Sequence, residues 1–117
     1  MWTRGTLYDR ADYPAMTSGF DRVLGECWAF REAEMAAVLR TLDAIEGANQ
    51  PGQPDLYRRV EVEVWSWDVS GDTVIEAPAA GTAFAYHYAS DPELQGFVRM
   101  KPGRPQASIC WPPRDRD

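Results

Sequence analysis

The spacing of apolar residues changes twice along this chain, and this change is what most constrains the fold. Residues 2–9 are typical of a short strand, and residues 22–30 alternate between two faces as a strand does. Within residues 31–46 the apolar side chains instead recur every three or four positions, which places them on one helical face: Met35, Val38, Leu39, Leu42 and Ile45. Alternation returns in residues 57–67 and 82–89. The pattern therefore predicts one helix between groups of strands.

Turn and capping residues support these limits. A proline restricts the residue before it to extended backbone, which predicts a turn at residues 12–14. Glu32 and Glu34 would lie in the first turn of the helix, where the helix dipole favours acidic side chains. Gly47 is suited to the left-handed position just past the helix end. A hairpin turn is predicted at residues 69–72.

Strands outnumber helices and short turns join them, so we expect an α+β fold. The expected architecture is a small mixed β-barrel or curled sheet with one main packed helix. The length of 117 residues accommodates a single domain. We assign this domain to residues 1–100. Residues 101–117 contain four prolines, and we expect them to form an extended tail.

Composition argues against several functional classes. The net charge of -6 does not suit a nucleic-acid-binding surface or a polybasic membrane contact. The chain has no apolar run of transmembrane length and no apolar signal segment, so we expect a cytoplasmic protein. Two cysteines and one histidine are too few for a disulfide scaffold or a thiolate zinc site. The single histidine also excludes any site that needs two imidazoles.

Glu46 is the residue that does not match its surroundings. It lies four positions after Leu42 and seven after Leu39, on the apolar stripe in the last helical turn. The helix C-terminus and partial burial both disfavour an ionised carboxylate there, so both raise its pKa. A raised carboxyl pKa suits a general base near neutral pH. The alternative is an ordinary helix-end glutamate that faces water or pairs with Arg58 or Arg59.

Other candidate groups are weaker. Asp43 lies one position off the stripe, and we expect it to be solvated. Cys27 and His87 could in principle form a nucleophile and base pair, but no third group is indicated to orient the imidazole. Cys27 more readily fills space in a strand, and His87 lies between two tyrosines in an alternating segment.

Five segments, taken in order, resemble the γ-glutamylcyclotransferase-like (AIG2-like) superfamily. They are GTLYDRADYPAM, VLGECWAF, LDAIEG, YRRVEVEV and AFAYHYA. The resemblance implies a small β-barrel with a cavity and an intramolecular reaction. In that reaction a γ-glutamyl amide or amine cyclises to 5-oxoproline and releases an amine or amino acid, without metal or cofactor. The family's acid/base is the glutamate of LD-x-x-EG, which matches Glu46 here. We also expect Tyr57 and Tyr86 to line the binding site of this small-molecule γ-glutamyl substrate.

The family's N-terminal YGSL-type turn has no counterpart here, because residues 5–7 are followed at once by the later motif LYDRADYPA. We therefore expect an N-terminally short domain with an open sheet edge, which a homodimer could cover. The chain could be a fragment or could take a strand from another chain. It could also be a non-catalytic binding or interaction module on the same fold. A further reading is removal of a γ-glutamyl protecting group from an amine product.

Overall fold

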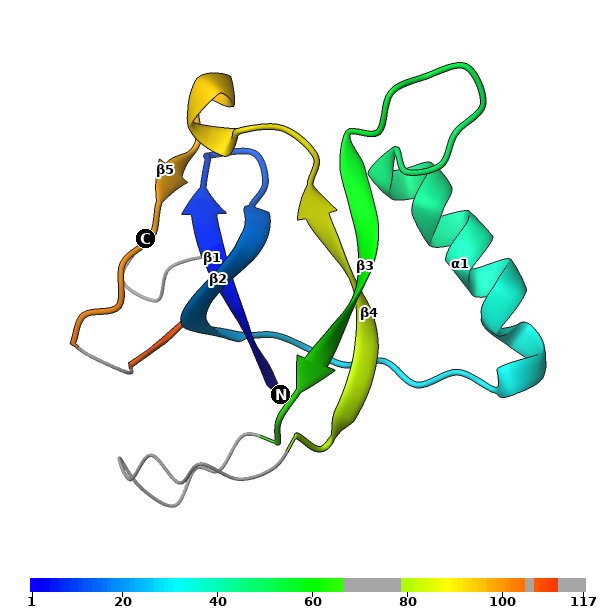
Figure 1. Cartoon of the computed structure of the whole chain (residues 1–117), viewed down its shortest axis with the longest axis horizontal. Helices are drawn as coiled ribbons and strands as arrows, with labels where there is room; N and C mark the ends of the chain where they lie inside the picture. The colour runs from blue at the N-terminus through cyan, green and yellow to red at the C-terminus, as the bar shows by residue number, and fades with distance from the viewer. Residues whose placement is uncertain (67–78, 105–106, 112–117) are drawn as a thin grey trace.

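The computed structural model in Figure 1 describes residues 1–66, 79–104 and 107–111 of the chain. It contains one α-helix, α1 (Glu32–Glu46), and one 3-10 helix, η1 (Pro92–Gln95). The predicted turn at residues 69–72 lies outside the described residues, as does Trp67. The strands are β1 (Trp2–Asp9), β2 (Ala15–Leu24), β3 (Tyr57–Val64), β4 (Gly81–Tyr88), β5 (Val98–Arg99) and β6 (Ser108–Ile109).

The described strands form two sheets. The larger sheet has the order β5-β1-β2-β6, in which β1 pairs antiparallel with β2 and β5, and β6 pairs parallel with β2. The smaller sheet is the antiparallel pair β3–β4, with Tyr57 opposite Tyr88. An isolated bridge between Trp2 and Trp65 connects the two sheets. The fold is therefore α+β with one main helix, as predicted, but its described strands do not close into a barrel.

The sequence placed one strand wrongly. We expected a strand at residues 22–30, whereas β2 spans Ala15–Leu24 and residues 25–30 are exposed and belong to no strand or helix. The amide of Gly25 donates to the carbonyl of Met1 at 2.9 Å, and this bond is the end of the ladder in the described part of the chain. Alternation describes the side chains of a strand, but a strand also needs a neighbouring backbone to pair with. Beyond Gly25 the fold supplies no such neighbour among the described residues.

The other predicted elements are close to their expected limits. The helix expected at residues 31–46 is α1, and Gly47 ends it in the left-handed conformation, with φ 66°. The strands expected at 57–67 and 82–89 are β3 and β4. In the segment expected as an extended tail, Ser108–Ile109 pairs with β2 and Ile109 is buried.

Two apolar clusters form the core. One contains Ala15, Tyr57, Tyr88 and Phe97 and joins the two sheets at the end where β3 begins. The other contains Leu7, Val23 and Ile109 within the larger sheet. The members of both clusters lie on strands, except Phe97, which lies between η1 and β5. The helix α1 contributes no residue to the buried apolar core of the described chain.

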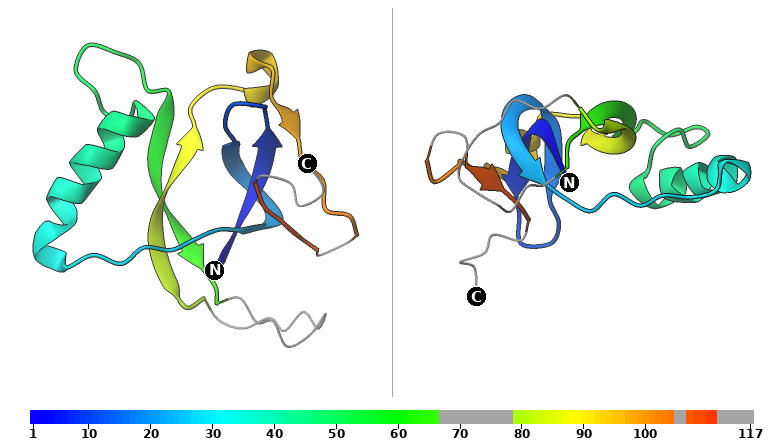
Figure 2. Two further views of the ribbon diagram at one scale, coloured as in Figure 1. Left: turned by 180° about the vertical axis from the view of Figure 1, so that it is seen from behind. Right: turned by 90° about the horizontal axis from the view of Figure 1, so that it is seen from below.

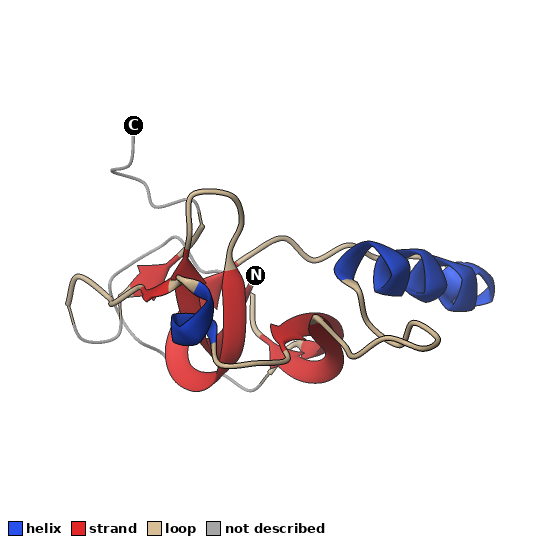
Figure 3. Ribbon diagram, turned by 90° about the horizontal axis from the view of Figure 1, so that it is seen from above, coloured by secondary structure: helices blue, strands red, loops and turns tan. Residues whose placement is uncertain are grey.

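The helix lies beside the smaller sheet, on the side away from β1 and β2. Two further views show α1 at one end of the molecule with β3–β4 between it and the larger sheet (Figure 2). The view from above shows the same arrangement (Figure 3). The apolar stripe of α1 is consequently half-buried at best, and its last member, Ile45, is exposed.

Candidate functional site

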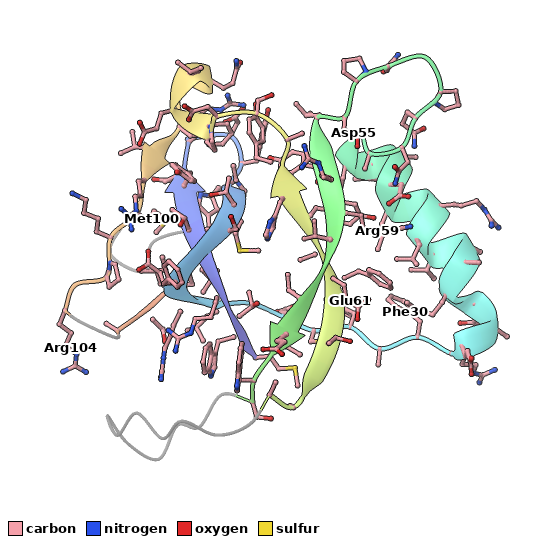
Figure 4. The ribbon with its side chains drawn as sticks, viewed as in Figure 1. Phe30, Asp55, Arg59, Glu61, Met100 and Arg104 are labelled. Carbon is pink, nitrogen blue, oxygen red and sulfur yellow. The ribbon has the colours of Figure 1, made fainter. Side chains whose placement is uncertain are left out.

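A broad groove separates α1 from the strands. Its volume is about 1310 Å³, and it is bounded by the apolar face of α1, the segment 25–30, β3–β4 and the inner face of β1–β2. Side chains line this space from both sides, with Glu61 from β3 and Phe30 from the segment before α1 (Figure 4). Arg59 of β3 is not part of this lining and instead contacts Asp43. The apolar stripe of the helix faces this groove.

Glu46 lines this groove at the C-terminal end of α1. The side chain is half-buried, with Leu42 and Ile45 from the helix and Leu56 and Tyr57 from the start of β3 lining the same part of the groove. Burial raises the pKa of the Glu46 carboxyl above its usual value of 4.5. The negative charge of Glu46 also helps to raise the pKa of the Tyr57 phenol, after the larger effect of burial. Glu46 is therefore a partly desolvated carboxyl facing a cavity.

The arginines that offered Glu46 an alternative partner do not pair with it in the described chain. Arg59 instead contacts Asp43, with 3.0 Å between its guanidinium nitrogen and the Asp43 Oδ2. Arg58 occupies the register position opposite His87, on the other face of the β3–β4 pair. The acid/base role of Glu46 stays a prediction, but its carboxylate is not committed to a surface ion pair among the described residues.

Asp43 is buried, which corrects the expectation that it is solvated. Only 7% of the residue is exposed, and it is the one buried polar or charged residue of the described chain. Three donors reach its carboxylate: Tyr86 Oη at 2.6 Å, Arg59 at 3.0 Å and Asn49 Nδ2 at 3.2 Å. The hydrogen bond from Tyr86 is the main cause that lowers the pKa of Asp43, and Asn49 and Arg59 act in the same direction.

The carboxylate of Asp43 ties three elements together. Tyr86 comes from β4, Arg59 from β3 and Asn49 from the loop that follows α1. That loop is also held by backbone bonds, from Ala48 to the Asp43 carbonyl at 2.8 Å and from Leu56 to the Gly47 carbonyl at 2.9 Å. Because Glu46 lies one turn after Asp43, these contacts fix the position of Glu46 relative to β3 and β4.

A sequence signal for Asp43 existed. Met35, Leu39, Asp43 and Glu46 are separated by four, four and three positions, so they lie along one side of the helix. The spacing alone still predicts a solvated Asp43, because a carboxylate beside an apolar stripe is ordinarily solvated. Two of the three donors that make its burial possible, Arg59 and Tyr86, lie 16 and 43 residues away in the sequence.

Tyr57 and Tyr86 both line the groove, but their hydroxyls are used within the protein. Tyr57 is buried and donates to the Pro14 carbonyl at 2.8 Å. Tyr86 donates to Asp43, and burial is the first cause that raises its pKa. A substrate-binding role for these residues stays a prediction, and it would use the rings rather than the hydroxyl groups.

Cys27 and His87 lie in different surroundings. Cys27 is exposed in the segment 25–30 and lines the groove. His87 is half-buried on β4 and is not part of the groove lining, and burial lowers its pKa, with Arg58 adding to the effect. No described hydrogen bond or ion pair connects the two side chains, so this geometry gives no support to a nucleophile and base pair.

No group of three or more histidine, cysteine, aspartate or glutamate side chains is arranged to hold a metal ion within residues 1–66, 79–104 and 107–111. Among those same residues, no helix has the length and apolar character needed to cross a membrane.

Comparison with known proteins identifies the family of this chain. The family model described as gamma-glutamyl cyclotransferase, AIG2-like, matches residues 1–106, which is most of the chain. No curated protein and no solved structure matches the chain.

Proposed function

Since the chain belongs to the gamma-glutamyl cyclotransferase, AIG2-like family, we propose that it cyclises γ-glutamyl compounds with Glu46 as the general acid/base. The family acts on small γ-glutamyl substrates. The proposed products are 5-oxoproline and a released amine or amino acid. The observation that carries the proposal is the half-buried Glu46 carboxyl with a raised pKa, which opens onto the groove from a position fixed by Asp43.

The proposed reaction needs one group that first takes a proton and then returns it. The α-amine of the glutamyl group attacks its own γ-carbonyl carbon, so a new carbon–nitrogen bond closes the five-membered ring. Glu46 accepts the proton that the attacking nitrogen loses. When the γ-amide bond breaks, Glu46 donates that proton to the leaving nitrogen. The overall reaction is therefore neutral in protons and consumes no second reactant.

Intramolecular attack reduces what the protein must supply. The nucleophile and the carbonyl belong to one molecule, so the reaction starts with a high effective molarity. Orientation of the glutamyl group and stabilisation of the developing oxyanion are the remaining requirements. The Glu46 carboxyl is partly desolvated by burial, and a lower local dielectric strengthens electrostatic interactions with it.

The two carboxyls at the end of α1 have environments that push their pKa values apart. Hydrogen bonds hold Asp43 ionised, whereas burial favours the protonated form of Glu46. Such a separation is the arrangement that distinguishes a structural carboxylate from one that transfers protons. This difference in pKa direction supports a proton-transfer role for Glu46 and a structural role for Asp43, which holds the C-terminal end of α1 in place.

A second candidate function is a non-catalytic binding module on the same fold. The exposed apolar side chains of the segment 25–30, which border the groove, favour it. A homodimer through an open sheet edge, a cytoplasmic location and removal of a γ-glutamyl protecting group remain predictions of the sequence. Turnover of a γ-glutamyl substrate distinguishes the enzyme from the binding module.

The test is release of 5-oxoproline from γ-glutamyl amino acids and γ-glutamyl amines, measured by mass spectrometry. We expect the chain to release 5-oxoproline and Glu46→Gln to release almost none, since glutamine keeps the shape of the side chain but cannot carry the proton. Glu34→Gln is the matched control, because Glu34 is exposed in the first turn of the same helix and outside the groove. Activity retained by Glu46→Gln, or no activity in the unmodified chain, would contradict the proposal.

A further inference from the structure

The segment between β2 and α1 is an unpaired extended stretch. Residues 25–30 run in a nearly straight path from one element to the other (Figure 1). After the bond from Gly25 to Met1, no backbone hydrogen bond involves residues 26–30 within the described chain. The segment also exposes two large aromatic side chains, Trp28 with 74% of its surface and Phe30 with 43%. Exposed apolar rings next to free backbone donors and acceptors are what an added strand covers.

The sequence of this segment is that of a strand. Glu26, Trp28 and Phe30 alternate with Gly25, Cys27 and Ala29, which is the period of two that predicted a strand here. In the structure, residues 26–30 have no backbone partner within the described chain. The sequence of this segment therefore suits a strand, and what it lacks is a neighbouring backbone to pair with.

The charges around the groove indicate what kind of neighbour would fit. The charged side chains that line it in the described chain are four glutamates, Glu26, Glu32, Glu46 and Glu61, with no lysine, arginine or histidine among them. The N-terminal ammonium of Met1 also lines the groove and donates to the Gly25 carbonyl at 3.1 Å, so negative groups outnumber positive ones. The rest of the lining is mostly apolar. An occupant that covers this surface must therefore bring apolar side chains together with positive charge.

The size of the groove leaves room for such an occupant. Pockets for small molecules usually enclose about 300 to 1,000 Å³. The volume of about 1310 Å³ exceeds this range, and Glu46 and residues 25–30 belong to different parts of the lining. The segment can thus bind a partner whether or not Glu46 acts as a catalyst.

We propose that residues 26–30 form the docking edge for an extended segment of a separate, basic polypeptide, which adds to this edge as an antiparallel strand. Directly opposed residues of such a pair lie on the same face. The partner therefore presents apolar side chains opposite Phe30 and Trp28 and a lysine or arginine opposite Glu26. Its recognition pattern is apolar–x–apolar–x–basic.

The charge argument disfavours a second copy of this chain as the occupant. The chain carries a net charge of -6, and self-pairing would bring together the glutamates that line two such grooves. Like charges across an interface oppose association. Self-association is therefore the outcome that the experiment must exclude.

The experiment uses the 117-residue chain and two short capped peptides. In both peptides two valines and one charged residue occupy alternate positions, separated by threonines. The charged residue is lysine in the first peptide and glutamate in the second. Binding is followed by amide chemical shifts and by hydrogen exchange of residues 26–30. Alkylation of the exposed Cys27 provides a second readout.

We expect the lysine peptide to bind, to protect the amides of residues 26–30 and to slow Cys27 alkylation, and the glutamate peptide not to bind. Glu26→Lys should reverse this preference. Trp28→Ala should weaken binding of the lysine peptide about ten-fold or more, as loss of an aromatic anchor does. The matched controls are Glu34→Lys and Phe20→Ala, which lie outside the groove lining and should leave binding unchanged.

Several results would overturn the proposal. They are binding of both peptides with equal affinity, binding that Glu26→Lys does not redirect, and no binding at all. Sedimentation of the chain alone provides the remaining check. A dimer whose amides at residues 26–30 are already protected would assign this edge to a second copy instead of a basic partner.

Discussion

The two ends of α1 are held in the fold in different ways. At the C-terminal end, Asp43 receives hydrogen bonds from two strands and a loop, and Gly47 continues into a loop with its own backbone bonds. At the N-terminal end, Arg31 supplies no side-chain cap, and the segment that precedes it is exposed. One helix thus has a fixed end and an open end.

This difference indicates where each kind of function belongs. Proton transfer requires a side chain held in a defined position by its neighbours, and Glu46 lies at the fixed end. Docking of a partner requires surface that nothing else covers, and residues 25–30 lie at the open end. The groove between them is continuous, so one cavity has two regions of different character.

The largest expected effect is on turnover at the fixed end. Glu46→Gln should reduce the rate of 5-oxoproline release by about 10² to 10⁴, which is the usual contribution of a general acid/base. Steady-state kinetics with a γ-glutamyl amine measures it. Trp28→Ala, at the open end, should leave this rate within about two-fold of the unmodified chain, because Trp28 takes no part in the proposed proton transfer. Equal losses for both variants would remove the distinction between the two ends.

The next effect is on stability. Asp43→Ala should lower the free energy of unfolding by about 2–3 kcal/mol, because it removes hydrogen bonds to a charged group and leaves Arg59 without its partner. Urea denaturation measures this loss. Turnover should fall as well, since the end of α1 that carries Glu46 loosens. A variant with unchanged stability would show that packing, and not Asp43, holds this end.

The pH dependence of stability should have opposite signs for the two carboxyls. The pKa of Asp43 is lowered from 3.8, so its stabilising contribution is present above that value and is lost as pH falls through the folded-state pKa. The pKa of Glu46 is raised from 4.5, so its contribution is present below that value and is lost as pH rises through the folded-state pKa. Urea midpoints recorded from about pH 3 to about pH 7 compare the variants.

Asp43→Asn should accordingly lose its stability deficit at low pH, and Glu46→Gln should gain in relative stability as the pH approaches neutrality. If both variants shift in the same direction across this range, the two carboxyls do not differ as described. Glu34→Gln again serves as the control, since this exposed side chain lies outside the groove.

The smallest expected effect is the change in stability caused by a substitution in the middle of the apolar stripe of α1. Val38→Ala should change the free energy of unfolding by no more than about 0.5 kcal/mol, because the higher helix propensity of alanine offsets the loss of a half-buried side chain. Thermal unfolding measures the change. A loss of about 1 kcal/mol or more, typical for a buried valine, would mean that the apolar face of α1 is covered in solution.

Local patterns were sufficient to predict much of the fold. Residues 2–9 form β1 with the predicted bounds, and the helix and the strands at 57–67 and 82–89 lie within a few residues of theirs. Gly47 ends the helix as its conformational freedom suggested. These features depend on the periodicity and on the backbone preferences of adjacent residues, which a sequence displays directly.

The candidate site likewise contains one residue that the sequence identifies and one whose role depends on tertiary contacts. Glu46 was identified from its place on the apolar stripe, because helical spacing alone puts residues 39, 42 and 46 on one face. The burial of Asp43 could not be identified in this way. It depends on Tyr86 and Arg59, and only the approach of β3 and β4 to α1 brings those donors within reach.

The sequence by itself therefore determined which segments are helical or extended and which face of α1 is apolar, since these follow from contacts within a few residues. The tertiary structure decided which extended segments become strands. Residues 108–109 pair with β2, whereas residues 26–30, with the clearer alternation, have no backbone partner in the described chain. Pairing and burial are made by groups distant in sequence, so their presence or absence at a given residue is fixed only when the whole chain is folded.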